Sequence, residues 1–237
     1  AQITRQRYFR LYERLCGMTG TAAGCEREFR QVYGLKTQSV PLRAPCQRNI
    51  LPPRFFTNAT AKWQAVVESV VELHALRRPV LIGTRSIDDS VRLAEVFRRH
   101  ALAFELLNGR QDVAEAEIVA RAGQPWAITI ATNLAGRGTD IRLAPEVVPR
   151  GGLHVVIAEC HDSRRVDRQL IGRCARQGDP GSAQMFVSAE DSLIQRFGPW
   201  LGEFLQRHAG RGGEVPLDLT RQVRRVQALA ERQDYAA

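Results

Sequence analysis

Short apolar runs alternate with amphipathic segments through the middle of the chain. The runs are typical of buried strands, which we expect at residues 78–84, 103–108, 126–132, 152–160 and 183–191. Between them, apolar residues recur at helical spacing and predict helices at residues 59–76, 86–100, 113–123 and 163–176. This alternation gives a parallel sheet covered by helices on both faces. We therefore predict one doubly wound α/β domain over residues 57–197.

The flanking segments have different patterns. Residues 1–35 read as two helices, at 3–15 and 25–33, on either side of a turn rich in Gly and Thr. Residues 36–56 contain four prolines, which break helices and predict an extended linker and a domain boundary. In the tail, residues 198–237, glycines and prolines interrupt the pattern before a last helix. That helix needs a packing partner for one apolar stripe, made of Leu219, Val223, Val226 and Leu229.

Composition narrows the class of protein. The 237 residues suffice for one or two domains with a core that needs no disulfide. No apolar run approaches the roughly 18 residues that span a bilayer, and the amino-terminal residues do not resemble a signal peptide. The missing initiator Met predicts a cut or processed end. Five cysteines without a C-x-x-C pair predict inert thiols in a reducing compartment.

The chain is strongly basic. Its formal charge is +9, and all but two of its 34 basic residues are arginines. Such a surface suits polyanions, namely nucleic acid, nucleotide phosphates or an anionic lipid face. A genome-wide preference for arginine codons explains the same excess. Both explanations stay open, and charge alone assigns no partner.

Candidate chemistry follows the predicted strands. Ligands of parallel sheets bind beyond the carboxyl ends of the strands, and three polar segments lie there: residues 84–86, 133–140 and 161–165. In the second, Gly136 and Gly138 allow a close approach of backbone to phosphate, Arg137 offers a charged fork, and Asp140 suits ribose hydroxyls or the orientation of Arg137. An ordinary turn between a strand and a helix is the alternative explanation for these residues.

The third segment leads into a predicted helix that carries Arg173 and Arg176. Residues three apart are neighbours on a helix, so these two arginines can converge on one anion, with Gln169 on the same side. Arginine keeps its charge and binds phosphate through two parallel hydrogen bonds. A solvated basic helix is the alternative explanation.

Taken together, the segments resemble the later motifs of superfamily 2 helicase-type motors. TIATNLAGRGTDI resembles motif V, and QLIGRCARQGDPG resembles motif VI. Within that superfamily the combination is most similar to the SecA family, the bacterial preprotein translocase ATPases. Further stretches that carry the resemblance are GMTGTA at 17–22, EREFRQVYGL at 26–35, VPLRAP at 40–45, PVLIGTRSIDDS at 79–90, GGLHVV at 151–156 and HDSRR at 161–165.

The resemblance implies two RecA-like motor domains with ATP and Mg²⁺ in the cleft between them. Residues 1–35 then correspond to the end of the first motor domain, 36–56 to the linker, 57–197 to the second motor domain, and 198–237 to a helical tail with the start of a scaffold helix. It also implies a preprotein substrate, a SecYEG-type channel as partner, and a cytoplasmic location with peripheral contact at the inner membrane.

Site roles also follow from the resemblance. Arg173 and Arg176 match the arginine fingers of motif VI, which approach the γ-phosphate and contribute about 10³–10⁵ in rate. The nucleotide-binding positions implied for the second motor domain are Arg137, Gly138, Asp140 and Gln169. Asp140 lies on the ribose side and Arg137 couples the cleft to the rest of the motor. No metal ligand is assigned to this chain.

The chain lacks the other half of an ATP site. A phosphate-binding loop, G-x-x-x-x-G-K-[ST], needs Gly directly before Lys, but Leu35 precedes Lys36 and Ala61 precedes Lys62. No apolar strand ends in an Asp-Glu pair. We therefore expect ATP and Mg²⁺ to be bound mainly by the first motor domain, and the chain to be inactive as an ATPase by itself.

Several positions depart from the family pattern. Where the family usually reads Q-L-R-G-R-S-G-R, this chain has Ile171, Cys174 and Ala175. These departures indicate a divergent, SecA-like member. Two other functions remain open. The first alternative is a helicase half that acts on nucleic acid, which the charge favours but the 7% aromatic content does not. Alternatively, it is a non-catalytic interaction module.

Overall fold

The chain forms two compact units, Ala1–Arg43 and Ala44–Ala237. The computed structural model describes residues 3–107, 112–132 and 139–236. In the first unit, α1 (Arg5–Phe9) begins at the cap residue Thr4, and α2 (Glu26–Tyr33) ends at Gly34 in a left-handed conformation. The expected helix over 3–15 stops at Phe9. Since α1 buries none of its side chains, it lacks the packing that stabilises most helices.

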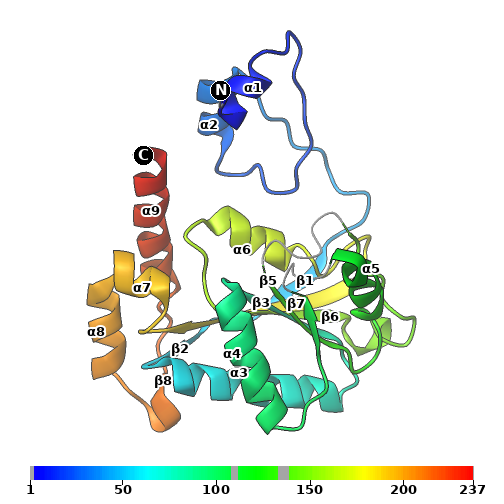
Figure 1. Ribbon diagram of the computed structural model, residues 1–237, viewed down its shortest axis with the longest axis vertical. Helices are drawn as coiled ribbons and strands as arrows, with labels where there is room; N and C mark the ends of the chain where they lie inside the picture. Colours follow the sequence, from blue (N-terminus) through cyan, green and yellow to red (C-terminus); the bar gives the residue numbers. More distant parts are fainter. Residues whose placement is uncertain (1–2, 108–111, 133–138, 237) are drawn as a thin grey trace. The chain divides into compact units, whose positions relative to one another are not determined.

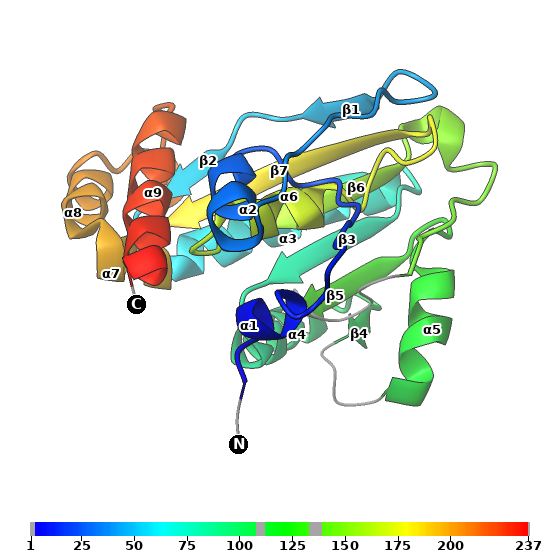
Figure 2. The same cartoon turned by 90° about the horizontal axis from the view of Figure 1, so that it is seen from above.

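The second unit is built on one sheet, shown in Figures 1 and 2. Among the described residues its strands run in the order β4-β5-β3-β6-β7-β2-β8, with β1 also paired to β7. All these pairs are parallel except β2 with β8. The strands are β1 (Gln47–Ile50), β2 (Arg54–Phe56), β3 (Val80–Thr84), β4 (Glu105–Leu107), β5 (Ile128–Thr132), β6 (Leu153–Ile157), β7 (Pro180–Ser188) and β8 (Glu214–Val215).

Helices cover both faces of the sheet, so the predicted RecA-like α/β class is confirmed. On one face α3 (Ala59–Ala75) and α4 (Ile87–Arg99) pack on Val80 and Ile82. On the other, α5 (Asp112–Arg121) and α6 (Arg164–Ile171) pack on Leu81 and its neighbours. Successive residues of β3 therefore face opposite helix layers, as in a buried parallel strand.

Glycine at position 83 lets α6 approach the sheet closely. A Cβ atom built on Gly83 would lie 2.1 Å from Cδ2 of Leu170, a distance that no side chain tolerates. Leu170 is buried in the cluster on this face. Strand β3 thus supports the carboxyl half of α6.

A third apolar cluster joins the tail to the sheet. It is formed by α7 (Ser192–Phe197), α8 (Pro199–Arg207) and α9 (Thr220–Ala236), which gather beside β2 and β8 (Figure 1). Leu219, Val223 and Val226 of the expected stripe are buried, but Leu229 is exposed and Ala230 takes its place. Short 3₁₀ turns lie at Val148–Arg150 and Arg211–Gly213.

The proline-rich segment is more ordered than expected. Instead of a plain extended linker, it contains β1 and β2, which follow the same border of β7. Pro52 and Pro53 separate the two strands because proline has no N–H for the ladder. Gln47 and Arg48 therefore belong to the sheet, together with the residues that follow them.

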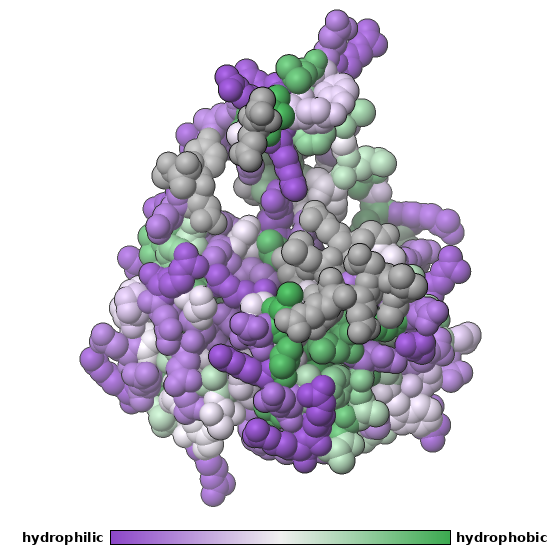
Figure 3. Space-filling model, viewed as in Figure 1, coloured by the Kyte–Doolittle hydropathy of each residue, from purple (hydrophilic) through white to green (hydrophobic). Residues whose placement is uncertain are grey.

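Hydrophilic side chains cover much of the face drawn in Figure 3. In the described ranges, no helix combines the length and the apolar character needed to cross a bilayer. The five cysteines are free thiols.

Candidate functional site

The two arginines of the candidate site lie just beyond α6. We call residues 172–179, which connect α6 to β7, the arginine turn. The helix was expected to continue to residue 176, but it ends at Ile171 with Gly172 as its carboxyl cap. The prediction that Arg173 and Arg176 share a helical face is therefore wrong. The chain instead closes short turns, in which Arg173 N–H donates to Leu170 O at 2.9 Å and Asp179 N–H donates to Arg176 O at 2.9 Å.

The arginine turn nevertheless meets the end of the motif V segment. Arg173 Nη1 donates to the backbone oxygen of Thr139 at 2.9 Å. Arg176 Nη1 pairs with Asp140 Oδ1 at 2.8 Å, and Gln177 Nε2 donates to Asp140 Oδ2 at 3.0 Å. Arg173, Arg176 and Asp140 thus form one cluster, although the helical argument for it fails.

The backbone of the arginine turn has an unusual conformation. Ala175 and Gln177 have φ angles of 54° and 55°, in the left-handed region that disfavours residues with a Cβ atom. Side-chain bonds hold the turn: Arg176 Nε donates to Gly172 O at 2.8 Å, Arg48 of β1 donates to Cys174 O at 2.9 Å, and Gln47 Nε2 donates to Gly178 O at 2.6 Å. These contacts stabilise a conformation that the local sequence does not favour.

The remaining predicted positions have separate outcomes. Arg137 and Gly138 lie outside the described residues. Gln169 is half-buried on α6, one turn before the arginine turn. Gln177 and Arg48 also contact this site, although neither was predicted. Arg48 leaves no local signal, because its partner lies 126 positions away in the chain.

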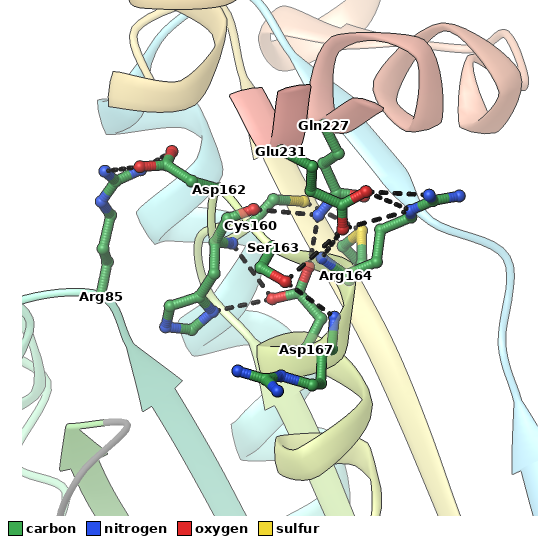
Figure 4. A network of polar contacts seen from close by, with 11 residues as sticks. Arg85, Cys160, Asp162, Ser163, Arg164, Asp167, Gln227 and Glu231 are labelled. Atoms are coloured by element: carbon green, nitrogen blue, oxygen red, sulfur yellow. Dashed lines mark hydrogen bonds and ion pairs between the residues drawn. The ribbon is translucent and has the colours of Figure 1, made fainter. Parts of the chain in front are cut away.

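The loop after β6 carries a second polar network, drawn in Figure 4. Asp162 binds both terminal nitrogens of Arg85, at 2.9 and 2.8 Å, and so joins the carboxyl ends of β6 and β3. His161 Nδ1 lies 2.7 Å from Asp167 Oδ1. Gln227 of α9 donates to Asp167 Oδ2 at 2.6 Å. The H-x-S-R-R stretch is therefore anchored to both the sheet and the tail.

Burial shifts the pKa values of Glu159 and His154, which lie near opposite ends of β6. Glu159 lies beside the ion pair of Lys62 and Asp191 in the interior. Burial, with the charge of Asp191, raises the pKa of Glu159 to about 7, although Lys62 opposes the rise. At the opposite end of β6, burial lowers the pKa of His154 to about 4, and the nearby charge of Arg78 adds to this.

The cluster at the arginine turn has the chemistry of an anion site. Two guanidinium groups beside one carboxylate can bind phosphate oxygens while the carboxylate keeps one of them oriented. The positive charge of the two guanidinium groups suits the phosphates of a nucleoside triphosphate. Within the described ranges, no three His, Cys, Asp or Glu side chains come together as a set of metal ligands.

Comparison with known proteins identifies the family. The chain matches the model of the SecA P-loop domain over residues 45–148 and 144–210, and that of the SecA DEAD-like domain over residues 1–30. It is 50% identical over 198 residues to the protein translocase subunit SecA of Desulfovibrio desulfuricans, covering 84% of this chain and 23% of that protein. The SecA of Halothermothrix orenii is 43% identical over 238 residues, covering 99% and 28% respectively.

Among solved structures, the Escherichia coli DEAD-box protein SrmB, bound to the regulator RraA, is similar with a TM-score of 0.49 and 22% identity. That match covers 65% of this chain and 83% of the SrmB chain. The chain spans about a quarter of the length of the SecA relatives named above. The SecA P-loop domain model, by contrast, accounts for most of the second unit. The chain belongs to the SecA family.

Proposed function

We propose that this chain acts as the second motor domain of a SecA-type ATPase that drives preprotein translocation. Arg173 and Arg176 would act as arginine fingers on ATP that the first motor domain binds. The observation that carries the proposal is the cluster of both arginines with Asp140, in the turn between α6 and β7 at the amino end of β7. The match to the SecA P-loop domain model supports ATP as the nucleotide of this proposal.

The arginines and Asp140 of the cluster have different roles in this proposal. ATP with Mg²⁺ supplies the phosphoryl group whose transfer the arginines assist by stabilising charge in the transition state. Arg176 offers one guanidinium nitrogen to Asp140, which keeps the side chain extended toward the motif V segment. Asp140 is also our candidate for the ribose hydroxyls, with Arg137, Gly138 and Gln169 as further nucleotide-binding residues.

The sequence contains no phosphate-binding loop of the G-x-x-x-x-G-K-[ST] type. We therefore assign phosphate and Mg²⁺ binding to the first motor domain, and expect no hydrolysis by this chain alone. By its family, the partners of the whole protein are a preprotein and a SecYEG-type channel. We place it in the cytoplasm, with peripheral contact at the inner membrane, and assign it no nucleic-acid partner.

The test compares two arginine variants in the protein that contains both motor domains. Arg176→Ala should lower kcat for ATP hydrolysis by about 10³-fold, since an arginine finger contributes about 10³–10⁵ in rate. Arg99→Ala, an exposed arginine at the end of α4, is the matched control and should hydrolyse ATP normally. Unchanged turnover in Arg176→Ala would refute the finger role. Hydrolysis that instead requires RNA or DNA would favour a helicase.

A further inference from the structure

The amino end of α6 is bound by a carboxylate from α9. Glu231 Oε1 accepts the backbone N–H of Arg164 at 2.9 Å, while its Oε2 accepts from Nη2 and Nε of the same residue at 2.9 and 3.2 Å (Figure 4). The first N–H groups of a helix have no partner within it, and the helix dipole favours negative charge there. Glu231 therefore stabilises the start of α6 through both its charge and its hydrogen bonds.

One turn earlier on α9, Gln227 makes a second connection in the interior. Its Nε2 donates to Asp167 Oδ2 at 2.6 Å and to the backbone oxygen of His161 at 3.0 Å. Gln227 and Asp167 are 3% and 4% exposed, so water cannot easily replace either bond. Loss of such a partner leaves buried polar groups unsatisfied, which costs about 1–3 kcal/mol.

Helix α6 links these contacts to the arginine turn. Its eight residues span roughly 12 Å at 1.5 Å per residue, so α9 holds one end and the turn begins at the other. Gly172 N–H still donates to Arg168 O at 2.8 Å, which continues the helical bonding into the turn. A helix this short moves as a unit, and a shift at its start changes the position of Arg173.

We infer that Gln227 and Glu231 are positioning residues of the nucleotide site: through α6 they set where Arg173 and Arg176 stand, without touching either one. This inference rests on the proposed function, because it gives the arginine turn its role on ATP. It adds that the middle of α9, at Gln227, and the following turn, at Glu231, act on hydrolysis from the far end of α6.

A first experiment needs no nucleotide. Backbone hydrogen exchange is measured on the 237-residue chain and on the variants Glu231→Gln, Gln227→Met and Arg232→Gln. Arg232→Gln is the matched control, because it removes a charge from the exposed residue next to Glu231 in the same turn of α9. We expect the amides of Arg173 and Cys174 to exchange about tenfold faster in the first two variants than in the control. Equal exchange in all three overturns the inference.

A second experiment separates positioning from folding. In the protein with both motor domains, Glu231→Gln should lower kcat for ATP hydrolysis several-fold with little change in KM, because fingers act in the transition state. Arg164→Gln should have the same effect, and the double variant should be no worse than either single one. Equal melting temperatures for Glu231→Gln and Arg232→Gln would exclude general unfolding as the cause.

The outcomes distinguish this inference from the proposed function. Normal kcat in Glu231→Gln, beside a large loss in Arg176→Ala, overturns the inference and leaves the proposed function standing. Normal hydrolysis in Arg176→Ala overturns the proposed function and the catalytic part of the inference with it. The exchange experiment then decides by itself whether α9 sets the position of the arginine turn.

Discussion

Replacing Glu159 by glutamine should stabilise the chain in alkaline solution and have little effect in acid. Glu159 is 6% exposed and accepts the backbone N–H of Ser192 at 3.0 Å. Its surroundings favour the protonated form, because burial and the charge of Asp191 raise its pKa from 4.5 to about 7 against the pull of Lys62. A glutamine keeps the acceptor for Ser192 and carries no charge.

The direction of the effect follows from where the proton sits. Between pH 4.5 and about 7 the unfolded chain has released the Glu159 proton, whereas the folded chain still holds it. The free energy of unfolding therefore falls as the pH rises through this window and stays lower above it. At about 1.36 kcal/mol per pKa unit, the full loss is about 3 kcal/mol. The glutamine variant lacks this loss.

Urea unfolding at a series of pH values between about 4 and 8 measures the effect. The difference in unfolding free energy between Glu159→Gln and the unmodified chain should grow by about 3 kcal/mol across this range. Glu95→Gln, which removes an exposed carboxylate from α4, serves as the control. A difference that does not change with pH would refute the assignment of a buried, protonated Glu159.

Two further predictions concern stability. Ala175→Gly should stabilise the chain by about 0.5–1 kcal/mol in urea unfolding, because glycine adopts the left-handed φ of 54° without the cost that alanine has there; a loss of stability would contradict this. His154→Asn should flatten the acid limb of the stability curve. With the pKa of His154 lowered to about 4, the unfolded chain takes up the proton first, so stability falls as the pH drops below about 6.5, by about 3 kcal/mol in all. An unchanged acid limb in that variant would exclude His154 as its source.

The parallel core could be predicted because its signals are local. The run over β3 is apolar at nearly every position, and α4 begins at Ser86, whose side chain accepts the N–H of Asp89 at 3.0 Å. A strand with both faces buried and a helix with a capping residue need no distant partner to be recognised. The order of elements then restricts the topology to a doubly wound sheet.

The parts that the sequence did not predict depend on distant contacts. Strand β1 is polar, Gln47–Ile50, and becomes a strand only because β7 supplies its hydrogen bonds. The arginine turn continues a helical pattern through RCAR, yet Gly172 and the bond from Arg48 to Cys174 O end the helix. Helix α8 was missed because glycines and Pro199 dominate its surroundings, although proline suits a first helical position.

The candidate site shows the same division. The arginines and Asp140 were found from spacing and resemblance, and their clustering agrees with that choice, while their role on a nucleotide stays a prediction. Two distant contacts, from Arg48 of β1 to the arginine turn and from Gln227 of α9 to α6, had no recognisable pattern. Each acts across more than 55 positions of the chain, and a one-dimensional pattern carries no trace of such a pair.

The borders of the sheet have a consequence for the behaviour of the protein in solution. Within the part of the chain that the structure describes, its outermost strands are short: β4 has three residues, β8 has two and β1 has four. An edge strand presents unpaired N–H and C=O groups to which a strand of another molecule can bind. The number of hydrogen bonds that it offers grows with its length. Edge strands this short offer few hydrogen bonds to an incoming strand. We therefore expect little edge-to-edge aggregation of this sheet, even at high protein concentration.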